Sequence, residues 1–203
     1  MWGTPCSSKR AWRISSKRGL VEVPCDTWGG FAWFSLDPDV RPLREFLDPI
    51  PQHLDPYNFH KMALTRDLTV EWNCNWKTSV DAFNESYHVQ GIHPQLMWYL
   101  HDLDIQIDCY ERHNRYLIPF ATWSPRVRRP PSIPDPIKVI MKAAGMDPAD
   151  YDEPLENLRR DVQRHKRQHG PTQGKDYSRL NDDQLTDDYH YLIFPNVTLN
   201  VHA

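Results

Sequence analysis

Hydrophobic and polar residues alternate along several short stretches of this chain, as they do in half-buried β-strands. The alternation predicts strands at residues 19–24, 31–36, 59–72, 103–110 and 115–121. Gly29-Gly30 predicts a turn that joins the first two of these strands into a hairpin. The closing segment, residues 189–201, also has strand composition, and Pro195-Asn196 predicts a bend or bulge within it.

Helical segments are predicted between these strands. The shorter ones are residues 42–47, 137–144 and 154–168, whereas residues 48–57, with three prolines, are expected to form a loop. One longer helix is predicted at residues 75–88, because an apolar stripe repeats there at helical spacing, formed by Trp76, Val80, Phe83 and Tyr87.

A second stripe of that helix consists of Asp81, Glu85 and His88. It is either the hydrated side of an amphipathic helix or two acids stacked against an imidazole. His93 follows His88 by five residues, and five helical steps separate two side chains by about 140°. The two imidazoles can therefore share a metal ion only if the helix ends between them, which Gly91 permits. The spacing alone allows such a site without requiring one.

Composition and charge exclude several classes of protein. The net charge of −3 does not suit a nucleic-acid partner, and no window approaches the roughly 18 apolar residues of a membrane-spanning helix. We therefore expect a soluble, cytoplasmic protein. Its widely spaced cysteines predict reduced thiols and no iron–sulfur or zinc site; they are Cys6, Cys25, Cys74 and Cys109. Residues 1–18 are basic and serine-rich, as in a transit peptide, an unmatched leader or a partial gene start.

Three stretches together resemble Rieske non-haem iron oxygenase α subunits, the aromatic-ring-hydroxylating dioxygenases. The signature segment combines Asn75-Trp76-Lys77 with Phe83-Asn84-Glu85-Ser86-Tyr87-His88 and His93-Pro94. Residues 23–38 resemble that family's passage out of its Rieske domain, and Ile193-Phe194-Pro195-Asn196 resembles its active-site strand. The resemblance implies an α+β catalytic domain of helix-grip (START/Bet v 1-like) type, in which an antiparallel sheet wraps a long helix.

The same resemblance implies a domain order. Residues 19–47 would end the connection from the Rieske domain, and residues 48–203 would form a partial catalytic domain. Within it, residues 124–187 would be a peripheral insertion or a lid over the pocket.

The resemblance also assigns site residues. His88 and His93 match ligands of a mononuclear Fe(II), and Glu85 matches the acid that links the iron to the Rieske cluster of a neighbouring subunit. Asp81 or Glu85 can orient a ligating imidazole. Two imidazoles and a carboxylate leave iron positions open for dioxygen, although zinc suits such ligands too. The mostly apolar pocket, which suits an aromatic or other small organic substrate, is expected to include Ala82, Tyr87, Val89, Tyr191, Phe194, Asn196 and Thr198.

Some parts of the family pattern have no match in this sequence. The family's third ligand, an Asp beyond the Phe-Pro-Asn strand, is unmatched, as are the Cys-x-His and Cys-x-x-His pairs of the [2Fe-2S] Rieske cluster. We therefore expect a fragment with little turnover of its own. The parent enzyme would receive electrons from NADH through a reductase and often a ferredoxin, and would hydroxylate its substrate with O2. The family's assemblies predict a homotrimer or an α3β3 complex.

Two alternatives remain open from the residues alone. A metal-free helix-grip module would bind an apolar ligand and would not need either histidine as a metal ligand. A zinc hydrolase would use His88, His93 and Glu85, with Glu85 ligating from one helical turn before His88.

Overall fold

The computed structural model describes residues 20–203. These residues form two compact units, divided between Thr69 and Val70, whereas the sequence placed the start of the catalytic domain at residue 48. Cys6 and the expected leader at residues 1–18 lie outside the described residues. No helix of residues 20–203 has the length and apolar character needed to cross a membrane. The three cysteines in the same range, Cys25, Cys74 and Cys109, are free thiols, as expected.

The first unit contains the predicted hairpin, but its first strand begins later than expected. Strand β1 (Cys25–Trp28) pairs antiparallel with β2 (Phe31–Phe34), so the prediction of a strand at residues 19–24 was wrong for the part that the structure describes. Gly29 and Gly30 have φ values of 65° and 85°. A two-residue hairpin loop with positive φ at both positions sets this register, because only glycine adopts such angles freely.

Helices follow the hairpin within the first unit. The predicted helix at residues 42–47 is α1 (Leu43–Phe46). The expected loop at residues 48–57 was wrong, because it contains α2 (Ile50–Leu54) and the 3-10 turn η1 (Asp55–Tyr57). Proline is tolerated in the first turn of a helix, where its missing N–H is not needed, so these prolines start helices. In this part of the first unit, a small core is formed by the buried side chains of Leu43, Leu47, Ile50 and Leu54.

The strand predicted at residues 59–72 is absent. A 3-10 turn, η2 (Phe59–Lys61), is followed by chain without regular structure up to α3. The apolar residues that suggested a strand are exposed, with Leu64 at 84% and Leu68 at 66%. An alternating pattern needs a neighbouring strand to accept its hydrogen bonds, and this segment has none among the described residues.

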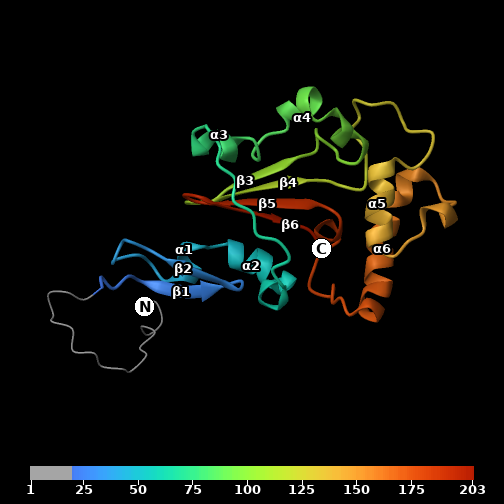
Figure 1. Ribbon diagram of the computed structural model, residues 1–203. Helices are drawn as coiled ribbons and strands as arrows, with labels where there is room; N and C mark the ends of the chain where they lie inside the picture. Colours follow the sequence, from blue (N-terminus) through green and yellow to red (C-terminus); the bar gives the residue numbers. More distant parts are fainter. Residues whose placement is uncertain (1–19) are drawn as a thin grey trace. The chain divides into compact units, whose positions relative to one another are not determined.

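The second unit, from Val70 to Ala203, is built on one antiparallel sheet. Its strands lie in the order β3 (Gln106–Cys109), β4 (Asn114–Ile118), β5 (Asp188–Ile193) and β6 (Val197–Val201). These strands confirm the predictions at residues 103–110, 115–121 and 189–201, with the expected bend forming the turn between β5 and β6. Figure 1 shows α3 and α4 over this sheet, and α5 and α6 beside one end of it. The mixture of helix and sheet confirms the α+β class.

The single helix predicted at residues 75–88 is two short helices. α3 (Trp76–Asp81) begins at Asn75, whose side chain accepts a hydrogen bond from the Lys77 N–H, and α4 (Tyr87–Ile92) follows a break. In the break, the Asn84 amide donates to the Val80 carbonyl at 2.7 Å. An asparagine that bonds the backbone in this way competes with helix propagation, so the apolar repeat did not continue as one helix.

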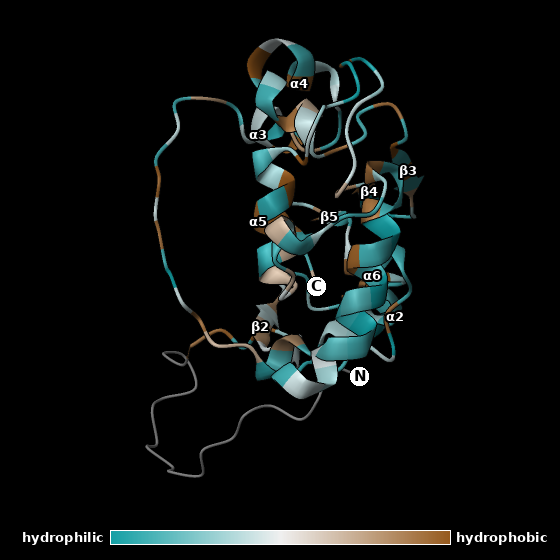
Figure 2. Ribbon diagram, turned by 90° about the vertical axis from the view of Figure 1, so that its right-hand side faces the viewer, coloured by the Kyte–Doolittle hydropathy of each residue, from teal (hydrophilic) through white to brown (hydrophobic). Residues whose placement is uncertain are grey.

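Residues 124–187 have a hydrophobic core of their own. It lies between α5 (Asp135–Ala143) and α6 (Leu158–His169), which confirm the helices predicted at residues 137–144 and 154–168. The side of α6 that faces the viewer in Figure 2 is mostly hydrophilic, as its exposed face requires. The buried members of the core are Ile133, Ile137, Met141, Ala144, Leu158 and Val162.

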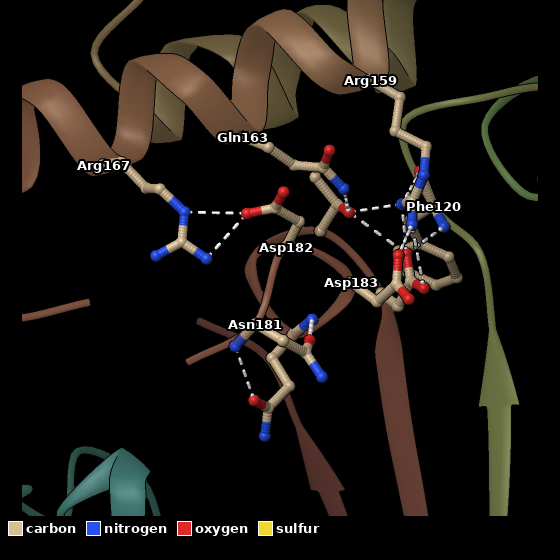
Figure 3. A network of polar contacts seen from close by, with 10 residues as sticks. Phe120, Arg159, Gln163, Arg167, Asn181, Asp182 and Asp183 are labelled. Atoms are coloured by element: carbon tan, nitrogen blue, oxygen red, sulfur yellow. Dashed lines mark hydrogen bonds and ion pairs between the residues drawn. The ribbon is translucent and has the colours of Figure 1, made fainter. Parts of the chain in front are cut away.

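A network of ion pairs connects α6 to the segment that leads into β5 (Figure 3). The Arg159 guanidinium contacts the Asp187 carboxylate, donates to Asp183 at 2.7 Å and donates to the Phe120 carbonyl at 3.1 Å. Nearby, the Arg167 Nε donates to Asp182 at 2.7 Å. Burial raises the pKa of Asp187, while hydrogen bonds from Arg159 and the Phe120 N–H oppose that rise. The network fixes the residue directly before β5.

We expect Arg159→Ala to lower the free energy of unfolding by about 3 kcal/mol, because it leaves a buried carboxylate without its cationic partner. Urea denaturation measures this loss. Arg129→Ala is the matched control, because Arg129 pairs with Glu156 on the surface and such a pair contributes less than about 1 kcal/mol. Equal losses in the two variants would contradict a special role for Arg159.

Candidate metal and substrate site

The side chains of His88, in the first turn of α4, and of His93, directly after its last residue, lie next to each other. Helix α4 continues through Gly91 and ends at Ile92, and His93 leaves it with φ −125° and ψ 52°. The two imidazole rings lie edge to face, with centroids 5.3 Å apart and an interplanar angle of 82°. Both side chains line the same cavity. The end of the helix therefore brings together two residues that a continuous helix would point apart.

Glu85 is the residue that orients His88. It precedes α4, and its Oε2 accepts a hydrogen bond from the His88 backbone N–H at 3.2 Å, while its Oε1 contacts the His88 Nδ1. Burial raises the pKa of Glu85, but the hydrogen bonds from His88 outweigh burial and lower it overall. An ionised carboxylate only accepts hydrogen bonds, so the proton of a neutral His88 belongs on Nδ1. The Nε2 lone pair then remains for a metal ion.

Asp81 does not share this arrangement. The predicted stripe of Asp81, Glu85 and His88 depended on one continuous helix, and the break at residues 82–86 removes it. Asp81 is exposed at the end of α3 and does not line the cavity, so the structure corrects the stacking of two acids with His88.

A cavity of about 640 Å³ lies between the helices α3 and α4 and one face of the sheet. The helix side contributes the side chains of Ala82, Phe83, Glu85, His88, Val89 and His93. The sheet side contributes Tyr116, Ile118, Asp188, His190, Asn200 and His202. Tyr116 is directly opposite His190 and His190 opposite Asn200 in the antiparallel register, which explains why they share a face.

Of the pocket residues expected from the sequence, Ala82 and Val89 line this cavity. The structure places the other five elsewhere. Tyr87 is 84% exposed, and Tyr191 is buried on the opposite face of β5, because successive side chains of a strand point to opposite sides. Phe194 and Asn196 lie in the turn after β5, and Thr198, opposite Leu192, lies outside the cavity lining.

Sequence reasoning missed all six residues of the sheet wall, of which Asp188 and His190 are the most informative. His190 is 3% exposed and stacks on Phe83 with ring centroids 5.0 Å apart, and neither ring nitrogen has a hydrogen-bond partner among the described residues. Burial lowers the pKa of His190 to about 4, so the ring is neutral. The signal was present in the strand Asp188–Ile193, where polar residues at positions 188 and 190 alternate with tyrosines at 189 and 191.

Asp188 is the other buried polar residue of this wall. It is 8% exposed, and burial raises its pKa to about 7. The charge of Asp187 also raises this pKa, whereas a hydrogen bond from Asn200 lowers it. The His202 Nε2 lies 3.5 Å from the Asp188 Oδ1. Burial lowers the pKa of His202, with a smaller contribution from Lys166, so that imidazole is neutral near pH 7.

The donor set suits part of a metal centre. No group of three or more His, Cys, Asp or Glu side chains within residues 20–203 is arranged to hold a metal ion. The two convergent imidazoles supply two donors, and the carboxylate on the Nδ1 of His88 is the partner that ligating histidines usually have. These residues therefore fit two positions of a mononuclear site.

Comparisons with known proteins support a family assignment. Residues 59–203 match the family described as "Ring hydroxylating alpha subunit (catalytic domain)". Curated relatives include the glycine betaine monooxygenase oxygenase subunits of Pseudomonas aeruginosa (strain UCBPP-PA14), 28% identical, and of Chromohalobacter salexigens, 29% identical. Each alignment spans 79 residues, which is 39% of this chain and 18% of the relative's length. No solved structure matches the chain.

The raised pKa of Asp188 predicts a pH-dependent stability. Its ordinary value is 3.8 and its folded value about 7, so between these values the folded protein binds a proton that the unfolded chain lacks. The contribution of Asp188 to the free energy of unfolding therefore decreases as pH rises from about 4 to 7. Asp188→Asn removes the effect. When the pH is raised from 5 to 8, the free energy of unfolding of the variant should therefore increase by about 2 kcal/mol relative to that of the unmodified protein.

Urea denaturation at the two pH values measures this gain. Asp104→Asn is the control, because Asp104 is exposed and does not line the cavity. The same pH dependence in Asp188→Asn and in the unmodified protein would show that Asp188 ionises normally.

Proposed function

This chain belongs to the ring-hydroxylating alpha subunit family, within its catalytic domain, and on that premise we propose that His88 and His93 are ligands of a mononuclear Fe(II) in an oxygenase. One observation carries the proposal: the two imidazoles converge at 5.3 Å on one cavity although five residues separate them in sequence. A metal ion gives a physical reason for two partly buried imidazoles to meet in this way.

Each neighbouring group has a definite task in this proposal. Glu85 holds a proton on the Nδ1 of His88, so that Nε2 faces a metal ion as a lone pair. Ala82, Val89 and Phe83 form apolar parts of the cavity wall, which keep water from surrounding a bound substrate. Fe(II) held by two imidazoles and a carboxylate has open positions for dioxygen, which is the chemistry that this centre supplies. No described residue is assigned the third position.

The wider catalytic cycle is part of the same proposal. Electrons would come from NADH through a reductase, with or without a ferredoxin, and through a [2Fe-2S] Rieske cluster to the mononuclear iron, where a small organic substrate is hydroxylated. The contact of Glu85 with His88 supports a role for this acid in linking the iron to a neighbouring subunit's cluster, as in a homotrimer or α3β3 assembly. The antiparallel sheet with helices over one face supports the helix-grip fold.

We expect His88→Ala and His93→Ala each to abolish Fe(II) binding, because each removes one of two imidazole donors. Anaerobic reconstitution followed by inductively coupled plasma mass spectrometry measures iron per chain. His60→Ala is the control, because His60 is exposed and does not line the cavity. Iron content that is unchanged in both cavity variants would refute the proposal.

Glu85→Gln should weaken Fe(II) binding by about 10-fold to 100-fold, because an amide is a poorer partner for the proton on a ligating imidazole. Competition with a metal chelator measures the dissociation constant. Asp81→Asn is the matched control, since Asp81 is a nearby carboxylate that does not touch His88 in the described structure. Equal effects of the two substitutions would mean that general charge, and not the contact, matters.

The same variants separate the two alternatives. Stoichiometric zinc together with hydrolysis that depends on Glu85 would replace the oxygenase with a hydrolase. Ligand binding that survives both histidine substitutions, with no metal bound to the unmodified protein, would indicate a metal-free binding module.

A further inference from the structure

Helix α6 carries two histidines one helical turn apart. His165 and His169 are four positions apart, so their side chains extend over the same face of the helix. The two imidazole rings stack, with centroids 4.0 Å apart and an interplanar angle of 21°. Neither side chain lines the cavity that contains His88 and His93. Two imidazoles are therefore held together at a second place in the molecule.

The backbone of α6 fixes the position of the proton on His169. The Nδ1 of this ring lies 3.1 Å from the carbonyl oxygen of His165. A carbonyl oxygen only accepts hydrogen bonds, so Nδ1 carries the proton and donates to it. In the neutral imidazole the other nitrogen, Nε2, then holds a lone pair. A backbone carbonyl is a partner that metal-binding histidines commonly have, because it fixes both the tautomer and the orientation of the ring.

His165 has a corresponding backbone partner at the end of α5. Gly145 follows the last turn of that helix with φ 86°, and its own N–H donates to the Lys142 carbonyl at 3.0 Å. Burial and the charge of His169 lower the pKa of His165, against an opposing hydrogen bond with the Gly145 backbone. A hydrogen bond that favours the protonated ring is one that the ring donates, so the Gly145 carbonyl accepts it. One nitrogen of the neutral His165 ring is thus engaged, and the other holds a lone pair.

The basic side chains beside this pair have partners of their own. Helix α6 is rich in arginine and lysine, which would repel a metal ion if their charges were uncompensated. The arginines nearest in sequence form ion pairs at 2.8 Å and 2.7 Å, Arg164 with Asp161 and Arg167 with Asp182. Lys166 is buried, and its Nζ donates to two backbone carbonyls. The positive charge around the two histidines is therefore largely balanced.

Two imidazole lone pairs select a class of metal ion. Imidazole nitrogen suits Zn(II), Ni(II) and Cu(II), whereas Mg(II) and Ca(II) prefer oxygen ligands. Histidines one helical turn apart can hold one ion between them, because both rings extend from the same face of the helix. An ion bound in this way has further coordination positions, which water can fill.

We propose that His165 and His169 form a second metal site, at which the two imidazoles chelate a Zn(II), Ni(II) or Cu(II) ion and water completes its coordination. Nε2 is the ligand atom of His169. The Gly145 carbonyl orients His165, so the site includes the contact between α6 and the end of α5. This site is separate from the pair His88 and His93, and a metal ion bound at one pair needs nothing from the other.

Nickel titration counts the sites. We expect the unmodified chain to bind two Ni(II) ions in isothermal titration calorimetry at pH 8, where the imidazoles are neutral. The double variant His88→Ala/His93→Ala should keep one of them. Adding His165→Ala or His169→Ala to this variant should weaken the remaining site at least about tenfold, because the chelate loses one of its two donors. Nickel binding that neither addition weakens, or an absence of binding by the double variant, would overturn the proposal.

Two controls test whether the effect belongs to the pair. Gln168→Ala, in the same double variant, changes an exposed residue of the same helix and should leave nickel binding unchanged. Mg(II) should not compete with nickel, because it prefers oxygen ligands. Alanine favours the helical conformation, so the histidine substitutions should leave α6 intact, and circular dichroism measures this. Equal weakening by Gln168→Ala and His169→Ala would mean that the helix surface, and not the imidazole pair, binds the ion.

A second measurement locates the ion. Ni(II) bound to the unmodified protein should raise the midpoint of thermal unfolding, since an ion that binds only the folded chain stabilises it. His88→Ala/His93→Ala should retain part of this rise, and His165→Ala in the same background should remove it. A chain that binds Fe(II) through His88 and His93 but lacks this second response would keep the proposed function and lose only the second site. The reverse result would leave the second site and refute the proposed function.

Discussion

The candidate site depends on the contacts that Glu85 makes with the first turn of α4. It satisfies the His88 backbone N–H at 3.2 Å and contacts the His88 ring, so one carboxylate both supports the start of the helix and orients a side chain. Free N–H groups at a helix start need acceptors, and a negative charge there is favourable. The same helix ends at Ile92, where His93 turns back toward His88. A helix of six residues thereby defines both positions.

The opposite wall of the cavity depends on a different set of interactions. Arg159 on α6 holds Asp187, and the next residue, Asp188, is the first of β5. Pairing of β5 with β4 and β6 then places Asp188 and His190 toward the cavity and Tyr189 and Tyr191 away from it. A slip of one residue would exchange these faces, so the ion pairs and the sheet register together decide which chemistry lines the cavity.

The two walls differ in how completely their polar groups are bonded. On the helix wall, Glu85 and His88 satisfy each other, and burial is partial. On the sheet wall, Asp188 and His190 are almost fully buried, and this burial raises the pKa of Asp188 to about 7 and lowers that of His190 to about 4.

The sequence by itself determined the family, the α+β class, most of the strands and helices of the second unit, and the pair His88 and His93. These are local properties, because spacing, turn residues and alternation are written in neighbouring positions. Only the tertiary structure decided where the helix breaks, since the Asn84 bond to Val80 competes with an apolar repeat that looks continuous. The tertiary structure also decided which face of β5 is directed toward the cavity. Both Tyr191 and His190 suit a buried strand, and only the partner strands and helices determine which of them meets the cavity.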